Sequence, residues 1–61
     1  MNKSQLKQFA MIKAHATTGN LDAAARGLSA MYRCAMGNKS KNEILIAAIA
    51  LNIRNNPEFI I

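Results

Sequence analysis

The chain has 61 residues, 51% of them apolar, and its eight Lys and Arg residues outnumber three Asp and Glu residues to give a net charge of +5. Such a length allows one small domain, residues 1–61, and excludes a cofactor-binding domain, a cleft between two domains and a repeat array. The apolar content excludes a disordered basic tail, because that class is poor in hydrophobic residues. Cores of this size are marginal, and many such chains need a partner.

The compartment is indicated by the cysteine count and by the apolar runs. Cys34 is the single cysteine, so no internal disulfide can form, and a lone thiol is typical of a reducing compartment. The start of the chain is polar and lacks the pattern of a signal peptide. The longest apolar run, Ile44–Leu51, has eight residues, whereas a membrane span needs roughly 20. We therefore expect a cytoplasmic, soluble protein with no membrane partner.

The first predicted helix covers residues 4–18. Its apolar positions follow the i, i+3, i+4 spacing of one helix face, with Ile12 beside them: Leu6, Phe9, Ala10 and Ala16. Two threonines then precede Gly19, which we expect to adopt the left-handed conformation that commonly ends a helix.

The second predicted helix covers residues 20–36. Asn20 is its predicted cap and Asp22 lies in its first turn, where the helix dipole favours an acid. One face is apolar throughout: Leu21, Ala24, Ala25, Leu28, Met31, Tyr32 and Ala35. The other face is polar and carries Ser29 and Arg33, together with a predicted ion pair between Asp22 and Arg26. Gly37 and Asn38 are predicted to close the helix.

The third predicted helix covers residues 40–55. Ser40 and Glu43 have the spacing of a capping box. The segment Ile44–Leu51 that follows is apolar on all sides, and two flanking helices cannot easily cover such a helix. We therefore expect the chain to self-associate. Asn56 precedes Pro57, and the residue before a proline avoids the helical region, so the helix should end there.

The expected fold is all-α: a three-helix unit with a short apolar C-terminal tail, self-associating through the third helix. The tail, Phe59, Ile60 and Ile61, either folds back onto the core or docks on a partner.

A second stripe of the middle helix consists of small residues: Ala23, Gly27, Ala30 and Cys34. Gly27 costs about 1 kcal/mol relative to alanine inside a helix, so a close contact should offset it. That contact is either packing within the chain or a homodimer interface or partner groove. Cys34 is expected to be a small buried hydrophobe.

Residues for catalysis or metal binding are few. His15 is the single histidine. The three acids have structural roles near predicted helix starts: Asp22 and Glu43 in the second and third helices, and Glu58 in one more turn that Asn56 and Pro57 could start. One His and one Cys supply two ligands, whereas structural zinc needs four. We expect no enzyme activity, no metal, no cofactor and no small-molecule substrate.

The basic residues give a candidate contact surface for nucleic acid or an acidic partner: Arg26, Arg33, Lys39 and Lys41. Arg26 and Arg33 are seven residues apart and could meet two phosphates, but a solvated helix face with Arg26 paired to Asp22 is the favoured interpretation. No aromatic residues are interleaved with the basic ones, so a base-stacking platform is not expected.

Two resemblances concern the same part of the chain. Residues 18–29 resemble the first half of the helix-turn-helix of LysR-type regulators, in which a Gly, an Ala-Ala pair and a Leu recur in this order. A recognition helix would then begin near Ala30, and Gly37 leaves it barely two turns. The continuous apolar stripe instead favours one unbroken helix.

The second resemblance is to PerC-like proteins, small regulators of enterobacterial plasmids and prophages, over residues 19–45. It is carried by Gly19, Ala24, Ala25, Arg26, Leu28 and Cys34. Gly27 departs from the large aromatic residue of that family, and the basic tract that usually follows is missing. The resemblance implies a small accessory regulator of mobile-element origin.

These observations predict a small non-catalytic regulatory protein, of phage or prophage type, that binds a protein partner and self-associates. The candidate partner or oligomer surface comprises Ala23, Gly27, Ala30, Cys34, Ile46, Ile49, Ile53, Phe59, Ile60 and Ile61. An apolar anchor with a basic rim suits a protein partner. The alternatives are a DNA-binding regulator that uses the basic faces or a degenerate helix-turn-helix, and an oligomeric scaffold without a further ligand.

Overall fold

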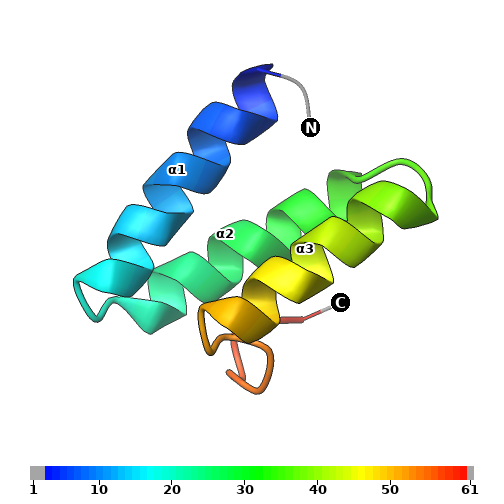
Figure 1. Ribbon diagram of the computed structural model, residues 1–61. Helices are drawn as coiled ribbons and strands as arrows, with labels where there is room; N and C mark the ends of the chain where they lie inside the picture. The colour runs from blue at the N-terminus through cyan, green and yellow to red at the C-terminus, as the bar shows by residue number, and fades with distance from the viewer. Residues whose placement is uncertain (1–2, 61) are drawn as a thin grey trace.

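The computed structural model describes residues 3–60, which form three helices and no strand: α1 (Lys3–Thr17), α2 (Leu21–Cys34) and α3 (Asn38–Ala50). This confirms the all-α, three-helix prediction. Figure 1 shows α2 between the other two helices, with α3 running antiparallel beside it and the N-terminal end of α1 pointing away. No Cα atom of α1 comes within 8 Å of a Cα atom of α3, so α2 alone joins these two described helices.

The turn between α1 and α2 depends on Gly19. Its φ is +89°, in the left-handed region that only glycine adopts without strain. The amide of Gly19 donates to the carbonyl of Ala16 at 3.1 Å, and that of Asn20 donates to the carbonyl of His15 at 2.9 Å. These two bonds form a Schellman motif and confirm the predicted end of α1. Asn20 precedes α2 as predicted, but its side chain makes no capping hydrogen bond.

The connection between α2 and α3 differs from the prediction. The chain leaves α2 after Cys34 and becomes extended at Ala35, with φ −69° and ψ 137°. Gly37, with φ +88°, then starts α3 instead of closing α2. Because the glycine reverses the chain so tightly, α3 begins at Asn38 and Ser40 lies inside its first turn. The predicted capping box of Ser40 and Glu43 is therefore wrong.

The end of α3 also lies earlier than predicted, at Ala50 instead of residue 55. Asn52 adopts a positive φ of 62°, and its amide donates to the carbonyl of Ile49 at 3.1 Å. The amide of Ile53 donates to the carbonyl of Ala48 at 2.7 Å, which completes a second Schellman motif. Ile53 is the last residue of this motif, and its apolar side chain is fully buried. Asparagine tolerates the left-handed conformation better than most residues, which is why the helix can stop here.

The core lies where α2 faces its two neighbours. The predicted apolar face of α2 is confirmed, since five of its residues are buried and the other two half-buried. The predicted buried stripe of α1 is partly wrong, because Leu6 and Ala10 are exposed and Ile12 alone is buried. The remaining core residues come from α3 and from the segment after it: Ile44, Ala48, Ile53 and Phe59.

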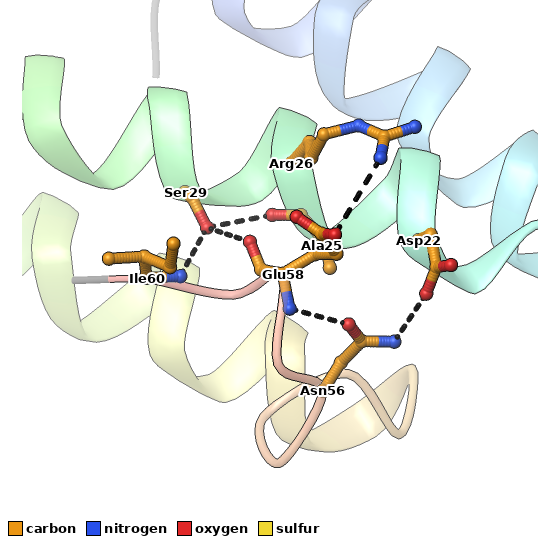
Figure 2. Close-up of polar contacts among 7 residues, drawn as sticks. All are labelled: Asp22, Ala25, Arg26, Ser29, Asn56, Glu58 and Ile60. Atoms are coloured by element: carbon orange, nitrogen blue, oxygen red, sulfur yellow. Dashed lines mark hydrogen bonds and ion pairs between the residues drawn. The ribbon is translucent and has the colours of Figure 1, made fainter.

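Residues 51–60, the C-terminal strap, return across α2 and α3 (Figure 2). Ser29, which the sequence places on a polar face, is 1% exposed and holds the strap. Its hydroxyl hydrogen is shared between the carbonyls of Ala25 at 2.8 Å and Glu58 at 3.1 Å, and its Oγ accepts the amide of Ile60 at 2.8 Å. One buried hydroxyl therefore links α2 to two backbone groups about 30 residues further along the chain.

Two further polar contacts fix the strap. The side-chain amide of Asn56 donates to a carboxylate oxygen of Asp22 at 3.2 Å, while its oxygen accepts the amide of Glu58 at 2.8 Å. The guanidinium of Arg26 lies 4.0 Å from the carboxylate of Glu58. Asp22 and Arg26 thus contact the strap, and the predicted pair between them is wrong, because a residue distant in sequence competes for each (Figure 2).

Ser29→Ala should loosen the strap. The substitution leaves the amide of Ile60 without its acceptor, and we expect a loss of about 1–2 kcal/mol in the free energy of unfolding. Amide hydrogen exchange of Ile60 should accelerate more than that of residues within α2. Ser40→Ala, at a half-buried serine on α3, is the control. Unchanged exchange at Ile60 would show that the hydroxyl does not hold the strap.

Candidate interaction surfaces

Residues 3–60 enclose no pocket and contain no group of three or more His, Cys, Asp or Glu side chains that could hold a metal ion. Within the same range, no helix is long and apolar enough to cross a membrane. The distinctive feature of this part of the chain is its apolar surface. Six large apolar side chains are more than half exposed: Leu6, Met11, Met36, Ile46, Ile49 and Ile60.

The small-residue stripe of α2 divides into a covered and an uncovered half. An ideal Cβ on Gly27 would lie 2.8 Å from Cγ1 and 2.9 Å from Cδ1 of Ile12, so Gly27 is the site where α1 approaches α2 within the chain. Ala23, one turn earlier, is half-buried, whereas Ala30 and Cys34 are exposed. Cys34 is therefore not the buried hydrophobe that was predicted.

The outer side of α3 is apolar and exposed. Ile44 and Ala48 face α2 and are buried, but Ile46 is 66% exposed and Ile49 is 65% exposed. Ile46, Ile49 and the exposed Ala50 follow helical spacing and form one apolar surface, the α3 ridge. The prediction that neighbouring helices leave part of this helix uncovered is confirmed.

The charges near the α3 ridge balance. Lys39 and Glu43 are one turn apart at the start of α3, on the side of the helix that also carries Ile46. Their opposite charges leave this part of the surface nearly neutral.

The C-terminal residues predicted for the same surface are split by the fold. Ile53 and Phe59 are buried within the chain, so they are removed from the candidate surface. They are buried because the strap closes over α2 and α3 instead of extending the third helix. Ile60 is 62% exposed, and Ile61 lies outside the described residues.

The four basic residues that were predicted to form one contact surface have different surroundings. Arg26 lies 4.0 Å from Glu58, and the Lys41 ammonium lies 5.7 Å from the centre of the Tyr32 ring. Both therefore have partners within the chain. Arg33 and Lys39 are exposed. α2 also continues without a break to Cys34, so there is no turn near Ala30 where a LysR-type helix-turn-helix would require one.

Sequence reasoning missed the outer face of α1 as a site. This face, defined as Lys3, Leu6, Lys7, Met11 and Lys13, combines three basic and two apolar exposed residues. The whole helix contains no Asp or Glu. The absence of acids from residues 3–17 is the sequence signal that could have identified this face. The face was missed because helical spacing alone assigned Leu6 to the core.

Comparison of the chain with protein-family models, curated protein sequences and solved structures gives no significant match.

Proposed function

We propose that this protein is a small non-catalytic regulatory or accessory protein that self-associates and binds a protein partner. The observation that carries the proposal is the α3 ridge, where two isoleucines are each about two-thirds exposed on a folded chain. Contiguous exposed apolar surface on a small domain is a feature of protein–protein interaction sites. The resemblance to PerC-like regulators supports a regulatory role of phage or prophage type.

A second copy of the chain is the occupant that best suits the α3 ridge. In a two-fold interface each residue meets the same patch of the other copy, so a charged patch would repel itself. The ridge avoids this problem because its side chains are apolar and the charges of Lys39 and Glu43 next to it cancel. The contact is small for a stable interface, so we expect association at micromolar to millimolar protein concentration.

Sedimentation equilibrium over a concentration series tests self-association. The wild type should show reversible association, and Ile49→Asp should be monomeric, because a buried carboxylate without a partner opposes the interface. Asn55→Asp adds the same charge at an exposed position of the strap and is the matched control. Circular dichroism should show equal helix content for all three proteins. A wild type that is monomeric at millimolar concentration, or an Ile49→Asp variant that associates normally, contradicts the proposal.

A further inference from the structure

We infer that the outer face of α1 is a second docking surface, and that it binds an acidic, partly apolar segment of a partner protein. This inference deepens the proposed function and rests on it, because it specifies the partner's chemistry. It uses residues of α1 that are separate from the α3 ridge, so the two surfaces can be tested independently.

The first argument is the segregation of charge. α1 carries Lys3, Lys7 and Lys13 and no acid, while all three acids of the chain lie at residue 22 or beyond. Two of those acids, Asp22 and Glu58, already contact Asn56 and Arg26. Within residues 3–60, no ion pair involves a lysine of α1. The Lys13 ammonium lies 5.6 Å from the centre of the Phe9 ring, so Lys3 and Lys7 are the lysines of this face without such a contact. The positive potential of this helix is therefore available to an anionic partner.

The second argument is accessibility. Ile12 is the only buried residue of α1, and among the helices α1 packs on α2 alone. Figure 1 shows its N-terminal end projecting away from the other helices. A partner segment can therefore lie along the helix without displacing any other element of the fold.

The third argument distinguishes a protein from a nucleic acid. Leu6 is 54% exposed and Met11 is 61% exposed, and both lie among the lysines. A phosphate backbone offers these side chains no apolar surface, whereas a protein segment can bury them between its own apolar residues. Methionine also adapts its shape to different partners. A second copy of α1 is disfavoured, since its lysines would face like charges.

The spacing of the face indicates the form of the partner. Lys3 and Lys7 are one helical turn apart, a rise of about 6 Å. Lys3 and Lys7 form a row between Leu6 and Met11 on this face. An amphipathic helix lying along α1 can present Glu or Asp at the same interval, with Leu or Phe residues on either side of the row of acids. It would then bury Leu6 and Met11 while its acids pair with the lysines.

The test is an NMR titration of the isotope-labelled full chain with a synthetic helical peptide of Glu and Leu, with Leu at i, i+4 spacing. Amide shifts should cluster within residues 3–13 of α1. Lys3→Gln/Lys7→Gln should weaken binding about three- to tenfold, in keeping with two exposed charge pairs. Leu6→Ser should weaken it without changing the charge. Arg33→Gln/Lys39→Gln removes two charges elsewhere and should bind almost as the wild type does.

Three results would overturn the inference. The first is a set of shifts that lies outside α1. The second is equal binding of a control peptide in which Ser replaces every Leu, which would show charge attraction alone. The third is stronger, salt-sensitive binding of a mixed-sequence DNA duplex that is lost in Arg33→Gln/Lys39→Gln, which would favour the DNA-binding alternative. If the peptide fails but Ile49→Asp still abolishes self-association, this inference fails and the role of the α3 ridge stands.

Discussion

Leu28→Ala should lower the free energy of unfolding of this protein by a large share of its total. Leu28 is fully buried near the middle of α2, within the core that α2 forms with its neighbours. Removing such a side chain costs about 2–5 kcal/mol, because the core loses both apolar burial and packing around the cavity. At roughly 0.05–0.15 kcal/mol per residue, the 61 residues have a total stability of about 3–9 kcal/mol. One substitution therefore removes a large share of the stability.

Urea unfolding followed by far-ultraviolet circular dichroism measures this loss. Leu6→Ala is the matched control, since it makes the same chemical change at a leucine that is 54% exposed. We expect it to cost less than about 1 kcal/mol. Similar losses for the two variants would show that α2 does not pack against its neighbours as described.

Gly27→Ala should destabilise the wild type and stabilise the Ile12→Ala variant. In the wild type, the new methyl group would meet Cγ1 of Ile12 at 2.8 Å and Cδ1 at 2.9 Å, so α1 must shift. Cγ1 is attached directly to the β-branched carbon, and Ile12 is only 4% exposed, which leaves little room for another rotamer. The expected cost of overpacking, about 1–3 kcal/mol, exceeds the gain of about 1 kcal/mol in helix propensity.

The Ile12→Ala background removes both atoms that the methyl group would meet. Gly27→Ala should then gain its helix propensity and fill part of the cavity, so the sign of its effect should reverse. A double-mutant cycle of unfolding free energies measures the interaction between the two positions. If Gly27→Ala has the same sign in both backgrounds, the close approach of α1 to Gly27 does not limit packing.

Most of the fold follows from local signals in the sequence. The apolar face of α2 is a regular helical pattern, and Gly19 ends α1 by a conformation that glycine favours. The end of α3 was not predicted correctly. The apolar pattern up to Ile53 fits a continuous helix, and it fits equally well a helix that ends in a Schellman motif with Ile53 buried as the last residue of the motif. The choice between them depends on the packing of Ile53, which local spacing does not contain.

The candidate surfaces were less predictable than the helices. Ile46 and Ile49 were identified because an apolar helix of this length exceeds what two neighbours can cover. Ser29 was assigned to a polar face, since its partners, Glu58 and Ile60, are about 30 residues away in sequence. Leu6 was assigned to the core because periodicity shows which residues share a helix face. Periodicity does not show how far along that face the neighbouring helix extends.

The absence of close approaches between α1 and α3 makes stability uneven along the chain. Detaching α1 breaks one interface between helices and leaves the interface of α2 with α3 in place. Detaching α2 disrupts both interfaces at once. We therefore expect partial opening of α1 to require less free energy than global unfolding. A ligand that binds only the closed arrangement of α1 would suppress this opening and raise the stability of α1 selectively.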